Sequence, residues 1–249
     1  CSFFNSPNSL DMRYVVAVLF ILSLVKISSA QHESQFFQPE EDVYILAQNG
    51  LNMRSAPELT AAKVVTIPLG QKVRVLENSL VMWVLKDYGG YEIKNYWYKV
   101  KFAEKEGYVF GGYLSRFPAP LKDGKTMIYL DEYVKENFTL LSTKPLHTGE
   151  GDYRDCMNWF IYEEGLVVTQ NYCGRHDSYT RYIFEDTRLE EIAAMIHIVM
   201  LGLEEKGKIE SGVVYKETEQ TIVMSYDLCD YYLSKLPVGG VMLVEHCYD

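Results

Sequence analysis

The chain has 249 residues, of which 48% are apolar and 23% are charged, and its formal net charge is −10. This length allows one large or two small domains, and this composition is that of an ordinary globular protein. A negative surface repels phosphate backbones and no Lys/Arg cluster offsets it, so nucleic acid is not an expected partner.

The first 30 residues have the layout of a secretory signal peptide. Met12-Arg13 gives a short positive start, and the apolar run Val15–Val25 is too short to span a bilayer comfortably. Ser28–Ala30 then supply small residues for cleavage, with an uncleaved membrane anchor as the alternative. We therefore expect Met12–Ala30 to direct export to the periplasm or the medium, with no transmembrane segment after cleavage. Residues 1–11 are interpreted as an upstream extension of the reading frame.

Residues 31–41 are polar and are expected to form a loose mature N-terminus. Short strand-like segments separated by Gly, Pro, Asn and charged turns follow, and they predict a small all-β barrel or sandwich at 42–116. These segments are Val43–Ala47, Lys63–Ile67, Lys72–Leu76, Leu80–Leu85, Tyr96–Phe102 and Gly107–Phe110. Phe117–Pro120 and Asp123-Gly124 then interrupt regular structure, which places a domain boundary near residues 116–125.

The second half, residues 126–249, predicts an α+β domain in which an antiparallel sheet packs on one main helix. Thr187 and Glu190 match a capping box, and apolar residues at the spacing of a helix with one buried face follow it. We therefore predict the main helix at about 187–204 and a shorter helix at Tyr129–Glu136. The predicted strands are Leu166–Tyr172, Tyr179–Phe184, Gly212–Lys216, Thr221–Ser225 and Val241–Glu245.

Four cysteines follow the predicted signal peptide, and all lie in the second half: Cys156, Cys173, Cys229 and Cys247. An even number in an exported chain indicates disulfides, and three pairings are open. The first two cysteines flank one hairpin-like unit and the last two flank another. This similarity between the two units is too weak to establish an internal repeat. Zinc would require His246-Cys247 and Cys173 with His176 to converge. An oxidising compartment favours disulfides instead, so we predict no metal and no cofactor.

Five sequence elements resemble the pattern of bacterial SH3 domains, in that family's order. They are Leu51–Pro57 (LNMRSAP), Ile67–Gly70, Val73–Leu76, Trp97–Val100 (WYKV), and Gly107–Val109 with Tyr113-Leu114. The spacing of Leu69 and Gly70 departs from the family, because the two are adjacent here. Most motif residues, including Asn52, Arg54 and Trp97, are interpreted as building the fold. Gly107 is expected to permit a tight turn before the last strand.

Between Leu76 and Trp97 the chain departs from the family, whose members have a short hairpin there. Glu77–Tyr96 forms a long aromatic insertion, and insertions of this kind often carry function. It is either a docking surface for peptide or sugar, or a longer hairpin that packs its own Trp83. The candidate ligand-binding residues are Arg54, Trp83, Tyr88, Tyr91, Tyr96 and Tyr113.

The resemblance implies an exported, non-catalytic protein that binds cell-wall peptide, glycan or an envelope protein. One alternative is a Cys-dependent cell-wall hydrolase, since NlpC-type peptidases are often fused to bacterial SH3 domains. Such enzymes carry an Asp-Cys-Ser-Gly motif at a helix start, but Asp155-Cys156 lacks the Ser-Gly and no later His motif follows. We therefore favour a structural disulfide and predict no catalytic residue. The other alternative is a structural or assembly protein of the envelope.

Overall fold

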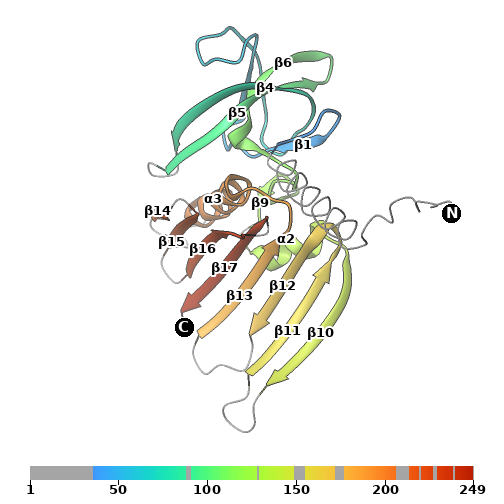
Figure 1. Ribbon diagram of the computed structural model, residues 1–249, viewed down its shortest axis with the longest axis vertical. Coiled ribbons are helices and arrows are strands. Elements are labelled where there is room, and N and C mark those ends of the chain that lie inside the picture. The colour runs from blue at the N-terminus through green and yellow to red at the C-terminus, as the bar shows by residue number, and fades with distance from the viewer. Residues whose placement is uncertain are drawn as a thin grey trace, which may run out of the picture.

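The computed structural model describes residues 36–87, 91–127, 129–148, 155–171, 177–205, 213–218, 220–226, 229–237 and 239–248. This part of the chain is mostly β and has three layers: a curled seven-stranded sheet, a helical layer, and an eight-stranded sheet (Figure 1). The predicted signal peptide at Met12–Ala30 lies outside the described residues. No helix in the described ranges is long and apolar enough to cross a membrane.

The first sheet has the strand order β3-β2-β6-β5-β4-β1-β7, and all its pairs are antiparallel. Its strands are β1 (Asp42–Ile45), β2 (Leu51–Arg54), β3 (Lys63–Ile67), β4 (Lys72–Asp87), β5 (Tyr91–Phe102), β6 (Lys105–Phe110) and β7 (Leu114–Ser115). The short helix η1 (Gly111–Tyr113) joins the last two strands. Alternate residues point inward, as in Val43 and Ile45 of β1 or Leu51 and Met53 of β2, and they form a common core.

The predicted insertion is the outer part of a long β4–β5 hairpin, which we call the arm. The two strands pair from Glu77 opposite Lys99 to Asp87 opposite Tyr91. The two strands expected at 72–76 and 80–85 are therefore one strand, interrupted by a bulge between Asn78 and Met82. At this bulge the side chains of Asn78 and Ser79 accept hydrogen bonds from the backbone N–H groups of Leu80 and Val81, two residues further along the chain.

Gly107 is required for a reason other than the expected turn. It lies inside β6, and a Cβ there would be 2.7 Å from the carbonyl oxygen of Arg54 and 2.7 Å from Cγ of Met53. The turn before β6 is made at Ala103, whose φ is 51°. Glycine therefore serves the close approach of β6 to β2.

The second sheet has the order β10-β11-β12-β13-β17-β16-β15-β14, again with antiparallel pairs. Its strands are β10 (Leu140–Thr148), β11 (Asp155–Tyr162), β12 (Leu166–Asn171), β13 (Asp177–Phe184), β14 (Val213–Thr218), β15 (Thr221–Tyr226), β16 (Cys229–Lys235) and β17 (Val241–Tyr248). Helix α2 (Leu130–Asn137) precedes β10, and α3 (Leu189–Glu205) precedes β14. A helix followed by a four-stranded meander thus occurs twice, and the two meanders join at β13 and β17. The predicted α+β arrangement of this half is confirmed in outline.

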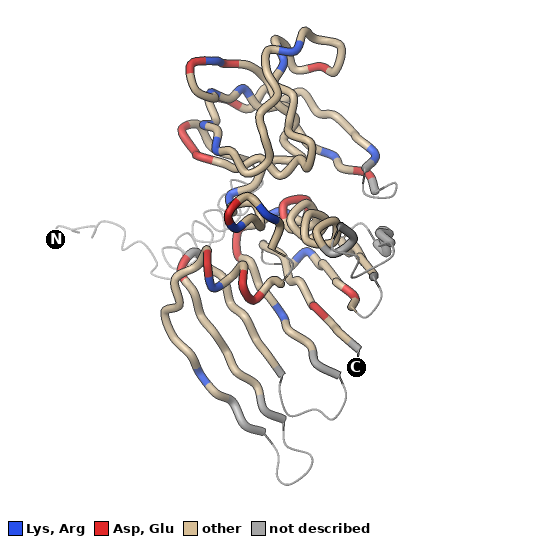
Figure 2. The backbone as a smooth tube through the Cα atoms, turned by 180° about the vertical axis from the view of Figure 1, so that it is seen from behind, with Lys and Arg blue, Asp and Glu red and all other residues tan. Residues whose placement is uncertain are grey.

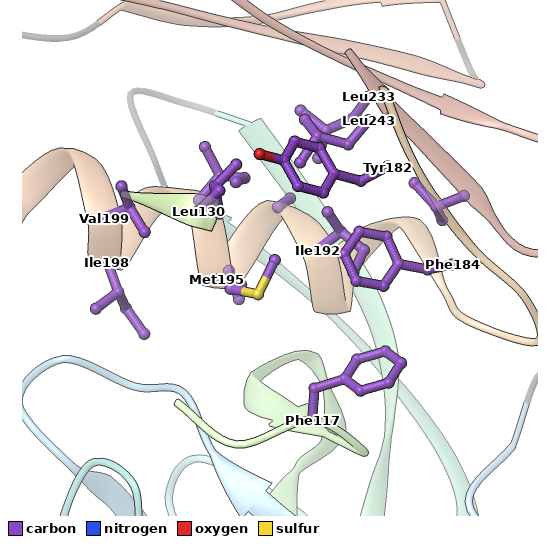
Figure 3. Packing of buried hydrophobic residues seen from close by; sticks show 14 of the residues in the cluster. Phe117, Leu130, Tyr182, Phe184, Ile192, Met195, Ile198, Val199, Leu233 and Leu243 are labelled. Atoms are coloured by element: carbon purple, nitrogen blue, oxygen red, sulfur yellow. The ribbon is translucent and has the colours of Figure 1, made fainter. Parts of the chain in front are cut away.

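Helix α3 has buried residues on two opposite sides, so the expectation of one buried face is wrong. Ile192 and Val199 are fully buried, and so are Met195 and Ile198, which point the other way (Figure 3). A single hydrophobic cluster runs from the first sheet through α3 to the second sheet. A helix that is apolar all round is expected when both of its sides are covered. Because this core is continuous, the division into two separate domains stays a prediction.

Charged residues of both signs lie where the first sheet meets the start of α3 (Figure 2). The helix begins at Leu189, two residues after the predicted start, and its Glu191 side chain is fully buried. Glu191 accepts hydrogen bonds from Nη1 of Arg116 at 3.2 Å, from the Arg116 backbone N–H at 2.9 Å, and from Nε of Arg188 at 2.9 Å. Arg116 also pairs with Glu41 at 2.8 Å. These contacts hold the first sheet and α3 together.

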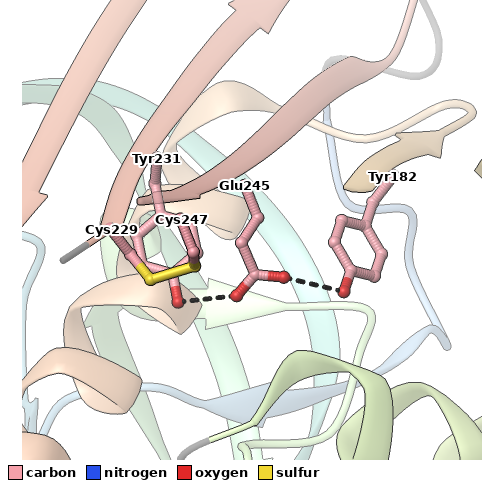
Figure 4. Close-up of a disulfide and its surroundings, with 5 residues drawn as sticks. All are labelled: Tyr182, Cys229, Tyr231, Glu245 and Cys247. Carbon is pink, nitrogen blue, oxygen red and sulfur yellow. Dashed lines mark hydrogen bonds between the residues drawn. A yellow bond between two sulfur atoms is a disulfide. The ribbon is translucent and has the colours of Figure 1, made fainter. Parts of the chain in front are cut away.

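One disulfide joins the neighbouring strands β16 and β17. Cys229 and Cys247 stand opposite each other in register and are bonded at 2.03 Å (Figure 4). Beside the disulfide, the hydroxyls of Tyr182 and Tyr231 donate to the two oxygens of Glu245 at 3.1 and 3.0 Å. The disulfide expectation is confirmed for this pair. Cys173 and the side chain of Cys156 lie outside the described residues.

Candidate functional site

A cleft of about 300 Å³ lies between the first sheet and α3, and we call it the aromatic cleft. One wall is the loop between β1 and β2, residues 46–50. The arm contributes Trp83 and Trp97 to another wall, and η1 contributes Tyr113. Helix α3 completes the cleft with His197. The first sheet and α3 thus form this cleft jointly.

Two polar residues of the LNMRSAP motif line the cleft and also hold the local fold. Arg54 donates from Nη1 to the carbonyl oxygen of Ala61 at 2.8 Å, which fixes the loop between β2 and β3. Asn52 accepts a hydrogen bond from the Thr66 hydroxyl at 2.8 Å, across the β2–β3 pair. These contacts agree with the interpretation that the motif mainly builds the fold.

Trp97 is 1% exposed, and its ring packs edge-on against Phe110 with centroids 6.1 Å apart. Its indole Nε1–H is buried and has no hydrogen-bond acceptor in the structure. Leaving such a donor without an acceptor costs about 1–3 kcal/mol. Trp97 therefore forms the buried back of the cleft, and its unpaired Nε1–H is a cost of packing this ring in the core.

Trp83 lies on the outer part of the arm and remains 38% exposed. In the β4–β5 register it stands opposite Asn95, so its ring projects from the same face of the arm as Trp97. Three residues just before it are also exposed: Leu80, Val81 and Met82, at 74%, 41% and 55%. The arm thus does not enclose its own tryptophan, and Trp83 forms an open wall of the cleft.

Residues 49–115 match the sequence model of the bacterial SH3 domain. This segment is a bacterial SH3 domain. The match covers β2 to β7, and the eight-stranded sheet lies outside it. No curated protein and no solved structure matches the chain. The family therefore identifies the sheet that carries the arm and most of the aromatic cleft.

Three of the six candidate binding residues come together at the cleft of the SH3 domain: Arg54, Trp83 and Tyr113. Tyr96 does not, because its ring packs against Phe36 with centroids 5.4 Å apart, on the other face of the arm. Tyr88 and the side chain of Tyr91 lie outside the described residues. His197 was not among the candidates, because a helix far along the chain brings it to the SH3 domain.

The geometry at Cys156 differs from that of a peptidase nucleophile. Cys156 lies within strand β11, opposite His147, and not at a helix start where a dipole would lower the pKa of a thiol. Cys247 is bonded to Cys229, so His246-Cys247 has no thiolate to offer zinc. In the described ranges no three His, Cys, Asp or Glu side chains gather to hold a metal ion. The aromatic cleft is therefore the best candidate site.

Proposed function

We propose that this chain is an exported, non-catalytic protein of the cell envelope, and that its aromatic cleft binds a segment of cell-wall peptide or glycan. The observation that carries the proposal is the cleft on the SH3 domain, which the exposed ring of Trp83 lines together with the exposed amides of Gln48 and Asn49. Aromatic rings supply a rigid apolar surface for a ligand, and amide groups can exchange hydrogen bonds with it.

Two further observations support the proposal. Bacterial SH3 domains commonly serve as cell-wall binding modules, and residues 49–115 belong to that family. The layout of Met12–Ala30 is that of a secretory signal peptide, which supports export. Export is tested by mass spectrometry of the protein recovered from the envelope fraction. A mature N-terminus at Gln31 supports it, and an intact N-terminal segment in the cytoplasm contradicts it.

Binding is tested by co-sedimentation of the purified protein with insoluble cell wall. We expect Trp83→Ala to weaken binding about tenfold or more, because a central aromatic contact is worth about 2 kcal/mol. Trp159→Ala is the matched control, since Trp159 has the same 38% exposure but lies on β11 of the other sheet. Equal binding by the wild-type and Trp83→Ala proteins contradicts the proposed site.

A protein ligand is the second candidate, and one observation favours it. Leu80, Val81 and Met82 are a run of exposed apolar side chains that directly precedes Trp83 in the arm. Patches of this kind often mark protein interfaces. A pull-down from solubilised envelope protein, in parallel with purified cell wall, separates the two ligands. Capture that is lost in Met82→Lys but kept in Trp83→Ala supports the protein ligand.

A further inference from the structure

A second groove lies on the other side of the loop that forms one wall of the aromatic cleft. This groove has a volume of about 660 Å³, and Thr66, Pro68 and Thr126 line it beside Leu201 of α3. The loop residues Gln48, Asn49 and Gly50 line both hollows. The two hollows are therefore neighbours separated by the width of one loop.

Helix α3 forms part of both hollows. His197 lines the aromatic cleft, and Ile198 and Leu201 line the second groove. His197 and Leu201 are four residues apart, so they lie on one face of the helix about 6 Å apart along its axis. A ligand that follows α3 would pass from one hollow to the other beneath or across the loop.

The lining of both hollows is nearly free of charge. Arg54 is the one Lys, Arg, Asp or Glu among the described residues that line them, and its guanidinium already donates to Ala61. In the whole chain 23% of residues are charged, so this surface is depleted. The polar groups offered instead are the exposed amides of Gln48 and Asn49.

This combination of groups fits an uncharged carbohydrate better than a peptide with charged ends. Aromatic rings can stack on the apolar faces of sugar rings, and amides exchange hydrogen bonds with hydroxyl and acetamido groups. Burying a charged ligand group against an uncharged surface would be unfavourable without a partner. Two hollows in a row fit a repeating chain of sugars.

We propose that the ligand is a glycan strand that occupies the aromatic cleft and the second groove together, with α3 as their common floor. This inference rests on the proposed function, because it extends the same site. The SH3 domain and helix α3 would then form the ligand site together. It also predicts that affinity increases with the length of the glycan.

The test uses the full chain and oligomers of N-acetylglucosamine of two, four and six units, with calorimetry as the readout. We expect the affinity to rise about tenfold or more between two and six units. Leu201→Ala and Pro68→Ala each change only the second groove, so both should remove this gain and leave the affinity for the two-unit oligomer unchanged. Two variants are used so that a folding defect in one leaves the test intact. His197→Ala should weaken binding at every length.

Two results overturn the inference. One is equal affinity for oligomers of two and six units; the other is a length-dependent gain that survives in both Leu201→Ala and Pro68→Ala. If no oligomer binds but intact cell wall still binds through Trp83, the inference fails while the proposed function stands, and the ligand is a peptide. If neither oligomers nor intact cell wall bind, the proposed function fails as well.

Discussion

Glu191 is the central group in the contact between the SH3 domain and α3, and Glu191→Gln tests this role with little change in size. Its two oxygens accept three hydrogen bonds, two from Arg116 and one from Arg188, and its side chain is fully buried. A glutamine at this position has no charge and presents an NH₂ group toward at least one of these donors. Two guanidinium groups would then lose their shared carboxylate.

The expected cost follows from the partners that remain. Removing one member of a buried ion pair costs about 3–5 kcal/mol. Arg116 keeps its pair with Glu41 at 2.8 Å, and Arg188 keeps longer contacts to Asn95 and Leu114 at 3.4 and 3.3 Å. These contacts offset part of the loss, so we expect a decrease of about 3 kcal/mol in the free energy of unfolding. Total stabilities are about 5–15 kcal/mol, so this is a large fraction.

Urea unfolding followed by circular dichroism measures the change. The control is Glu132→Gln, an exposed position on α2, where we expect a change within about 0.5 kcal/mol. A double-mutant cycle with Arg188→Met then measures the coupling between the two residues. A loss below about 1 kcal/mol in Glu191→Gln, or no coupling in the cycle, would refute the assigned role.

Three further changes test other parts of the structure. Replacing Cys229 and Cys247 by Ser should lower the free energy of unfolding by about 3 kcal/mol, because the disulfide closes a loop of 18 residues in the unfolded chain. An unchanged urea midpoint under oxidising conditions would show that the bridge does not form. Burial raises the pKa of Glu245, against the opposing hydrogen bonds from tyrosines, so the folded state binds this proton more tightly than the unfolded state. The stability that this proton contributes is complete below the ordinary pKa of 4.5 and is lost as pH rises through the pKa of the folded state. Over the same pH range, Glu245→Gln should become more stable relative to the wild type, because glutamine does not titrate. A difference in unfolding free energy that stays constant with pH would contradict this. Gly107→Ala forces a methyl group against Arg54 and should cost about 1–3 kcal/mol in thermal or urea unfolding, and a neutral result would mean that β2 and β6 are less close.

The sequence predicted the SH3 domain well because its signals are local. Alternating apolar residues mark the inner face of each short strand, and the motif residues lie within a few positions of the groups they contact, as Arg54 does with Ala61. The arm was harder to predict. Its two halves looked like separate strands because the bulge at Asn78–Met82 breaks the alternation without ending the pairing.

The second sheet was predicted less completely, because three of its strands lack a clear alternation. Strand β10 contains Pro145, which is tolerated because β10 is an edge strand. Strands β10, β11 and β16 were not predicted; β11 begins at Asp155 and β16 at Cys229, and both mix polar and aromatic residues. Their pairing partners, and not their own sequence, define them as strands.

The candidate site shows the same limit. Trp83, Arg54 and Tyr113 were found from the SH3 motif and its insertion, and these three lie at the cleft. His197 and Leu201 come from α3, whose apolar sequence indicated a buried helix but not what covers its second side. Only the packing of the SH3 domain on this helix brings them to the site.

The place of β17 has a consequence for how the protein is made. It is the last described strand, yet it lies in the middle of the sheet between β13 and β16. During synthesis, the edges of β13 and β16 stay unpaired until residues 241–248 leave the ribosome. Unpaired strand edges can associate with other chains. A nascent chain stalled before β17 would therefore depend on chaperones, and its Cys229 would lack its disulfide partner.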